Sequence, residues 1–453
     1  MNIYFFVFAC ALAGLLFGYD AGMISGAMLF IKKDLFVSNS QMGSIIAAMP
    51  IGAFFGAVFI GRLSDKVGRK IILLLSALLF VVGSFETSLS TGIIELILGR
   101  VILGVAIGAS SALAPMYICE IADEKQRGML VTLYLIAINL GIMLSYVMNA
   151  FFMESVLWRP LMVVGVIPAL LLGVCAYLLP ESPRWLMTRG KVGKASSILI
   201  KLYGSVKALT ILEELTALSN DIQAKTCKLW DKRYRSLTLL TVLVSVVSQL
   251  VGIKAIIYYA PTIFLETGLS TAPASILAAV AIGVTYTVAA VAAARIIDRI
   301  GRRQLLLSGL AGVIISLILI TWTLHHAHGA RMLGWLTLIG ALIFVFCQGM
   351  CLGPASLLIP AEVFPSRVRG MGMGIAIGAN WATNALVLFL FPITMHHFGL
   401  SFTFLFFLMF AIIGFFACYL WVPETKGATL EQIELSLHSG IELRQLACKI
   451  KNS

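Results

Sequence analysis

Two charged residues lie inside long apolar stretches of the chain, where they could carry chemistry. Asp20 lies in the middle of the first stretch, residues 4–30, and Lys254 lies in residues 237–264. An ionised carboxylate in such a stretch is costly unless it is paired or lines a water-filled cavity, and such groups often relay protons. A buried ammonium group needs an anion, either from the protein or from a ligand. Asp20 is therefore a candidate for proton binding, and Lys254 for ligand binding.

Charged motifs recur in the same order in the two halves of the chain. Residues 61–70 read GRLSDKVGRK and residues 298–303 read DRIGRR. Glu120 precedes Arg127 by seven residues, as Glu362 precedes Arg369. Residues 180–184 (PESPR) close the first half and residues 423–427 (PETKG) close the second. Three ordered matches indicate an internal duplication.

The elements that position these residues must be membrane-spanning helices. The chain has 453 residues, of which 60% are hydrophobic and 12% charged, and its mean hydropathy is +0.99. This composition excludes an ordinary water-soluble protein, and the apolar runs are too long for barrel strands. We expect an all-α membrane protein with twelve spans, at residues 4–30, 41–60, 71–89, 93–121, 129–152, 158–179, 237–264, 272–296, 304–325, 334–361, 371–396 and 400–422.

The positions of the basic residues predict the orientation of the chain. Most of the 33 Lys and Arg residues fall in alternate connections between the spans. By the positive-inside rule, both termini and the long polar segment 180–236 are cytoplasmic. This placement accounts for the net charge of +12 and argues against nucleic acid as a partner. The sequence contains no N-x-[ST] glycosylation site, which favours a bacterial inner membrane.

The polar segment divides the chain into four parts. We expect a six-helix bundle at residues 1–179, a cytoplasmic linker at 180–236, a second bundle at 237–422 and a cytoplasmic tail at 423–453. Apolar residues at helical spacing in the linker, such as Ile198 and Leu202, predict short amphipathic helices. The alternative is a disordered linker.

The repeated charged residues predict a cytoplasmic latch. Carboxylates and guanidinium groups at helix ends can form a network that holds one side of the protein closed and separates when the halves move apart. The alternative for any single Lys or Arg is that its charge only sets the orientation of the chain. The predicted gate comprises Asp65, Arg69, Glu120, Arg127, Glu181, Arg184, Asp298, Arg302, Glu362, Arg369 and Glu424.

No metal or cofactor is expected. The eight cysteines are scattered without a C-x-x-C pair, and the histidines near His325 lack the cysteine or carboxylate spacing of a zinc site. No nucleophile, base and oxyanion set can be assembled, so the sequence does not predict an enzyme.

The chain resembles the sugar porter family of the major facilitator superfamily, which includes bacterial sugar and proton symporters and facilitative glucose transporters. The resemblance rests on residues 18–20 (GYD), 180–186 (PESPRWL), 258–261 (YYAP) and 423–427 (PETKG), together with the paired GR[KR] loops. It implies two six-helix bundles, alternating access around a site at mid-membrane, no cofactor and no enzymatic activity.

The same resemblance suggests roles for Asp20 and Arg100. Symporters of the family have aspartate at the position of Asp20, whereas the uniporting glucose transporters usually have asparagine, so proton coupling is implied. Arg100 is implied as the partner of Asp20, whose protonation would loosen the pair. The alternative is a permanent structural ion pair that does not titrate.

The substrate positions match the family only in part. The sequence departs from the family pattern at Leu135, Ile142, Ser248, Lys254, Tyr286 and Leu357. The candidate substrate-binding residues are Phe17, Gln249, Lys254, Tyr258, Tyr259, Tyr286, Asn380, Trp381 and Asn384.

These residues leave several functions open. The leading expectation is a monomeric, proton-coupled importer of a small sugar or polyol in the cytoplasmic membrane. One alternative is symport of an organic or sugar-acid anion with Lys254 as counter-ion. Lys254 could instead pair with Asp20 or Glu266, or extend to the interface, while the substrate stays neutral. A non-coupled facilitator and a non-transporting sensor are the remaining readings, and the sequence does not name the solute.

Overall fold

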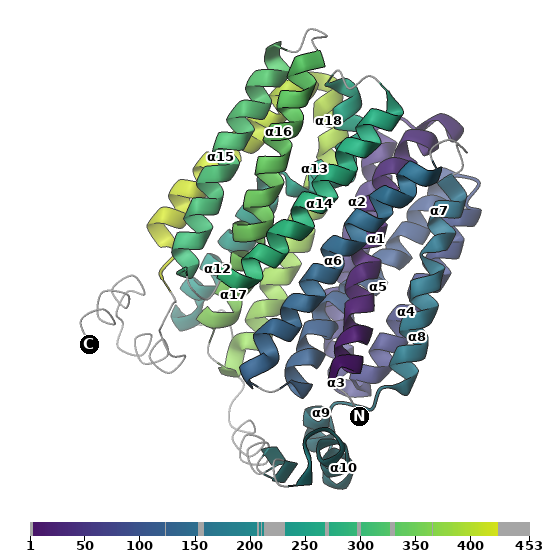
Figure 1. Ribbon diagram of the computed structural model, residues 1–453. Coiled ribbons are helices and arrows are strands. Elements are labelled where there is room, and N and C mark those ends of the chain that lie inside the picture. Colours follow the sequence, from purple (N-terminus) through teal and green to yellow (C-terminus); the bar gives the residue numbers. More distant parts are fainter. Residues whose placement is uncertain are drawn as a thin grey trace. The chain divides into compact units, whose positions relative to one another are not determined.

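The structure is a computed structural model. Every regular element among its described residues is a helix (Figure 1). The described residues are 3–122, 124–152, 158–205, 208–209, 211–212, 232–267, 271–296, 300–326, 331–364 and 366–424. By contacts the chain divides into two compact units. Unit 1 comprises Met1–Asp20, Ala48–Ile142 and Trp158–Thr226; unit 2 comprises Ala21–Ala47, Met143–Leu157 and Cys227–Ser453.

The helices of the first half follow the predicted spans closely. They are α1 (Ile3–Asp34), α2 (Asn39–Phe55) continued by the π-helical η1 (Gly56–Ile60), α3 (Gly61–Val67), α4 (Arg69–Leu89), α5 (Ile93–Ile121), α6 (Glu124–Phe152), α7 (Trp158–Val164) and α8 (Val166–Leu178). Two short helices follow in the predicted linker, α9 (Pro183–Thr188) and α10 (Val192–Tyr203).

The helices of the second half contain the breaks that the sequence did not predict. They are α12 (Lys232–Leu250), α13 (Ile253–Glu266), α14 (Ala272–Ile296), α15 (Arg302–His326), α16 (Arg331–Cys347), the π-helical η3 (Gln348–Leu352), α17 (Gly353–Val363) and α18 (Ser366–Trp421). The seventh predicted span is broken at Gly252, whose φ is 95°. The last two predicted spans form the single element α18, which kinks at Gly399 with φ 82°.

Eleven helical stretches of the described residues are long and apolar enough to cross a membrane. The last of them, Met371–Trp421, has 51 residues and holds the two final predicted spans. The prediction of an all-helical membrane protein is therefore confirmed.

Glycines allow close helix packing inside unit 1. The Cα atoms of Gly14 and Gly18 on α1 face the backbone of α6, and Gly141 on α6 faces the backbone of α1. A side chain at any of these positions would collide with a main-chain carbonyl oxygen. Such small residues let helices approach closely where lipid supplies no hydrophobic driving force.

Unit 2 joins the C-terminal ends of α1 and α6 to helices of the second half. The Tyr146 hydroxyl on α6 donates a hydrogen bond of 2.6 Å to the Ile257 carbonyl oxygen on α13. The Asn149 amide, also on α6, donates to the Gly22 carbonyl oxygen of α1 at 2.9 Å. The first contact holds α6 on α13 two residues before its non-helical residue Tyr259, which has φ −120° and ψ 15°, and the second holds α6 on α1.

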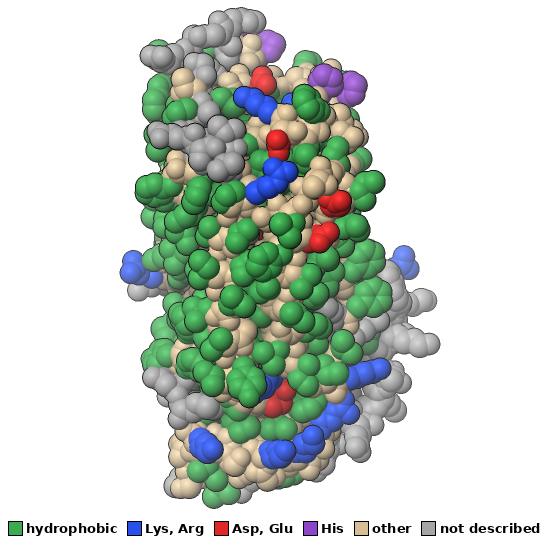
Figure 2. Space-filling model, turned by 90° about the vertical axis from the view of Figure 1, so that its right-hand side faces the viewer, with side chains coloured by type: hydrophobic (Ala, Val, Ile, Leu, Met, Phe, Trp, Pro, Cys, Tyr) green, Lys and Arg blue, Asp and Glu red, His purple; other side chains and the backbone are tan. Residues whose placement is uncertain are grey.

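Apolar side chains cover much of the outer surface. Figure 2 shows one face whose middle is mostly hydrophobic, with Lys and Arg gathered towards its lower end. Leu78 and Phe85 of α4 and Ile167 and Val174 of α8 are among the exposed apolar residues. Exposed apolar side chains on spanning helices are what a lipid environment requires.

Candidate functional site

Asp20 and Arg100, predicted as partners, form a buried ion pair in unit 1. α1 carries Asp20 and α5 carries Arg100, and the Nη1–Oδ1 distance is 2.5 Å. The side chains are only 6% and 0% exposed. Asp20 Oδ2 and Arg100 Nε and Nη2 make no hydrogen bond within the described part of the chain. If either partner were neutralised, the other would be a buried, uncompensated charge.

The residues next to Asp20 fix the rotation of α1. Gly18 packs directly against the α6 backbone at Ile138. The Tyr19 hydroxyl donates to the Leu161 carbonyl oxygen of α7 at 2.9 Å. Because α1 is held on two sides, the Asp20 carboxylate is directed at α5. In the GYD motif, Gly18 and Tyr19 therefore fix the helix so that Asp20 meets Arg100.

Unit 2 contains several buried carboxamide side chains. Gln249 lies at the end of α12, and Asn384 lies in α18. The Oε1 atom of Gln249 and both amide atoms of Asn384 lack a hydrogen-bond partner among the described residues. Buried polar atoms are nearly always paired in proteins, so these atoms indicate a place where a ligand or water binds.

Gln348 lies beside Gln249, because both contact Ser248, and the sequence analysis missed it. It begins η3, and its Nε2 donates to the Ser248 carbonyl oxygen at 3.1 Å. The neighbouring Gln249 donates to the Ser248 hydroxyl at 3.4 Å. The signal in the sequence is that Gln348 is the only Asn or Gln between residues 331 and 364.

Most of the other candidate substrate residues also lie in unit 2. Tyr259 is buried and donates from its hydroxyl to the Leu388 carbonyl oxygen at 2.7 Å, so this group holds α13 against α18. The Tyr286 ring packs against Gly349, beside Gln348. Tyr258 and Trp381 are buried, Asn380 is half-buried, and Phe17 is buried in unit 1.

Lys254 lies in the first turn of α13, directly after the break at Gly252, and is half-buried. Glu266 lies at the other end of the same helix. Twelve residues of helix separate them by about 18 Å, so these two residues cannot pair. Asp20 is already paired with Arg100.

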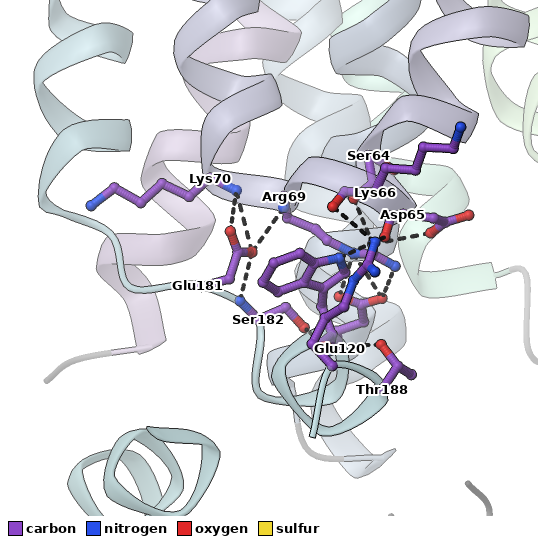
Figure 3. Close-up of polar contacts among 11 residues, drawn as sticks. Ser64, Asp65, Lys66, Arg69, Lys70, Glu120, Glu181, Ser182 and Thr188 are labelled. Carbon is purple, nitrogen blue, oxygen red and sulfur yellow. Dashed lines mark hydrogen bonds and ion pairs between the residues drawn. The ribbon is translucent and has the colours of Figure 1, made fainter. Parts of the chain in front are cut away.

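Three of the predicted gate residues, Asp65, Glu120 and Glu181, contact Arg69 (Figure 3). Its guanidinium group bonds Glu120 and Asp65, each at 3.0 Å, and donates to the Ser64 carbonyl oxygen at 3.0 Å. The Trp185 indole donates to the Asp65 carbonyl oxygen at 2.8 Å. The network therefore joins α3, α4, α5 and α9.

The PESPR and PETKG motifs have the same geometry in their separate units. The Glu181 carboxylate accepts from the backbone N–H of Arg69 at 2.8 Å, and the Glu424 carboxylate accepts from that of Arg302 at 2.8 Å. Each carboxylate also accepts from the next residue along the helix. Each therefore satisfies the free N–H groups at the N-terminus of α4 or α15, where a negative charge is favourable. The internal duplication is visible as this repeated cap.

The remaining gate candidates are described less fully. Arg184 is exposed on α9. Asp298 lies outside the described residues, as do the side chains of Arg127, Glu362 and Arg369. Among the residues that were described, no group of three or more His, Cys, Asp or Glu could hold a metal ion.

Comparisons with known proteins identify relatives of this chain and proteins with a similar fold. The family model described as sugar (and other) transporter matches residues 6–437. A glucose transporter of Staphylococcus epidermidis is 34% identical over 443 residues, covering 96% of this chain and 97% of the relative. An arabinose–proton symporter of Escherichia coli is 32% identical over 455 residues, covering 98% and 95%. The solved structure of a proton:xylose symporter, XylE, bound to 6-bromo-6-deoxy-D-glucose has a TM-score of 0.81 and 29% identity, and the match covers 96% of this chain and 98% of XylE.

Proposed function

We propose, from the premise that this chain belongs to the sugar transporter family of the major facilitator superfamily, that it imports a small sugar or polyol together with protons. The observation that carries the proposal is the buried pair of Asp20 and Arg100. A relative named as a proton symporter, similar over nearly the whole chain, supports it.

The pair can couple proton binding to a conformational change. Protonation of Asp20 removes the negative charge and weakens its attraction to Arg100, because the pair is held mainly by charge. The conformation in which the two groups meet then loses stability relative to one in which they are apart. An inward proton gradient would thereby drive solute accumulation by alternating access.

The Arg69 network would serve as the reversible latch of such a cycle. Asp65 is largely exposed, with 71% of its side chain accessible, whereas Arg69 is buried. A solvated pair of this kind contributes only about 1 kcal/mol. The Arg69–Glu120 pair is buried, with side chains 8% and 6% exposed, and both pairs lie within unit 1, so the network would act by holding α3, α4 and α5 together in one state of the cycle.

Uptake into proteoliposomes tests the coupling. Asp20→Asn is expected to abolish accumulation of a sugar against its gradient while leaving exchange of internal and external sugar partly intact. Asp34→Asn, the same change at an exposed position of α1, is the matched control and should accumulate sugar like the wild type. Undiminished accumulation by Asp20→Asn would refute the coupling role, and a wild-type protein that equilibrates sugar without regard to pH would be a facilitator.

Lys254 supports a second candidate, symport of an organic or sugar-acid anion. A half-buried ammonium group in an apolar helix could act as counter-ion to a ligand carboxylate. If so, Lys254→Asn should relax selectivity towards neutral sugars. An unchanged substrate profile would count against this candidate.

We place the protein in a bacterial cytoplasmic membrane as a monomer, with both termini in the cytoplasm. The similarity to bacterial transporters and the distribution of Lys and Arg support this location and orientation.

A further inference from the structure

Gln348 is held in a defined orientation deep within unit 2. Its residue is 2% exposed, and its Nε2 donates to the Ser248 carbonyl oxygen at 3.1 Å. The reverse amide orientation would set two acceptors against each other, so the bond fixes which atom is nitrogen. The Oε1 atom is then left buried, without a hydrogen-bond partner in the described residues.

The backbone around Gln348 is unusual in a way that is common at binding sites. Residues 348–352 form the π-helical segment η3 between α16 and α17. A π-helical turn inserts an extra residue and redirects the side chains on it, and such turns occur frequently at functional positions. The following Gly349 lets the Tyr286 ring approach the backbone beside Gln348.

The unpaired atoms of Gln348 and its neighbour Gln249 are both acceptors. They are Gln348 Oε1 and Gln249 Oε1. Carboxamide oxygens accept hydrogen bonds and give none. A solute that pairs with them must bring several O–H donors. A carboxylate or phosphate group offers only acceptors and would leave these oxygens unpaired at a cost.

We infer that Gln348 is a substrate-contacting, specificity-determining residue, and that with Gln249, which contacts the same Ser248, it selects a neutral polyhydroxylated solute over an anion. This inference rests on the proposed function, because it assigns the solute of the same transport site. Gln348 accepts one hydroxyl group of the solute, and its bond to Ser248 keeps the acceptor in place.

The test measures transport by the full-length protein in proteoliposomes. The solutes are D-glucose, D-xylose, L-arabinose and the anion D-glucuronate, followed by the mono-deoxy analogues of the best neutral sugar. Gln348→Met removes the acceptor at similar volume. Met350→Leu, on the same π-helical segment, is the control for disturbed packing, and thermal unfolding checks that each variant is folded.

We expect Gln348→Met to raise KM for the neutral sugar about tenfold, with kcat changed less than about twofold. For the wild type, one mono-deoxy analogue should have a KM about tenfold higher than that of the parent sugar. For Gln348→Met, the two KM values should be equal. Met350→Leu should keep the wild-type pattern. This loss of discrimination at one hydroxyl is something a purely structural role would not produce.

Two results would overturn the inference while the proposed symport stands. One is that Gln348→Met leaves KM unchanged, or raises KM for the parent sugar and for every analogue by the same factor. The other is a wild-type protein that prefers D-glucuronate to all three neutral sugars. If the wild type moves none of the four solutes, the proposed function and this inference fail together.

Discussion

At the scale of single residues, the Asp20 and Arg100 side chains stabilise the protein only as a pair. Two charges buried together offset part of the desolvation that each suffers, whereas one alone does not. Unpaired atoms remain on both side chains, so the pair is not a fully satisfied structural network. Such a pair is suited to being broken and remade.

Arg100→Met should therefore destabilise the protein more than the double variant Asp20→Asn with Arg100→Met. Removing one partner of a buried pair costs about 3 to 5 kcal/mol, while replacing both leaves no uncompensated charge. Thermal unfolding of the purified protein in detergent would measure this order. Equal melting temperatures for the single and double variants would show that the carboxylate finds another partner.

Residue patterns in the sequence identified Asp20 because a charge in an apolar span is conspicuous. The partner, Arg100, came only from resemblance, since no spacing relates residues 80 positions apart. Gln348 gives no comparable signal, because a single neutral carboxamide in an apolar helix carries no charge and belongs to no repeated motif. Its importance is visible only when the bond to Ser248 and the unpaired Oε1 are both known.

At the scale of elements, the N-termini of two helices are capped by carboxylates from distant parts of the chain. Glu181 follows the α4 N-terminus by 112 residues, and Glu424 follows that of α15 by 122. The sequence predicted both residues as gate charges. The structure adds that each caps a helix, a role that repeat spacing alone does not reveal.

Glu181→Ala and Glu424→Ala should each lower the melting temperature by about 1 to 3 °C, because each removes charge-assisted bonds from free helix N–H groups. Glu86→Ala, on the exposed face of α4, is the control and should have no measurable effect. Thermal unfolding compares the three variants. A large effect at only one of the two capping positions would show that the duplicated geometry is not energetically equivalent.

Gly18→Ala should disrupt the packing of α1 on α6, because its Cβ would overlap the Ile138 carbonyl oxygen. We expect a strongly lowered melting temperature and loss of transport, since Asp20 lies two residues away. Gly374→Ala is the matched control, because a Cβ there has open space. Alanine also favours helix over glycine, so this control should be neutral or slightly stabilising. Wild-type stability of Gly18→Ala would mean that the two helices can separate without cost.

At the scale of the whole molecule, the spans were predictable because a bilayer imposes their length and polarity. The contact units were not predictable in the same way. α1 is divided between units after Asp20, and α6 after Ile142. Hydropathy reports which residues meet lipid, and it carries no information about which helix end packs on which neighbour. The two six-helix bundles expected from the sequence stay a prediction.

The predicted orientation can be tested with single cysteines in a transport-competent variant whose native cysteines are replaced. Ser40→Cys, between α1 and the body of α2, should react with a membrane-impermeant thiol reagent in intact cells. Lys201→Cys on α10 should react only after the membrane is permeabilised. Both positions are exposed, so a lack of labelling reports sidedness. The opposite labelling pattern would show that the chain crosses the membrane in the opposite orientation.

The glycine kink of α18 limits what the protein can present at one membrane surface. Because α18 breaks only at Gly399, with φ 82°, the last two predicted spans are joined with almost no intervening peptide. The Ser401 hydroxyl then donates to the Thr321 carbonyl oxygen at 3.3 Å, fastening the returning arm to α15. A surface protease needs a stretch of extended chain, and an antibody needs a protruding epitope. This hairpin offers neither, so it is an unsuitable position for an inserted affinity tag.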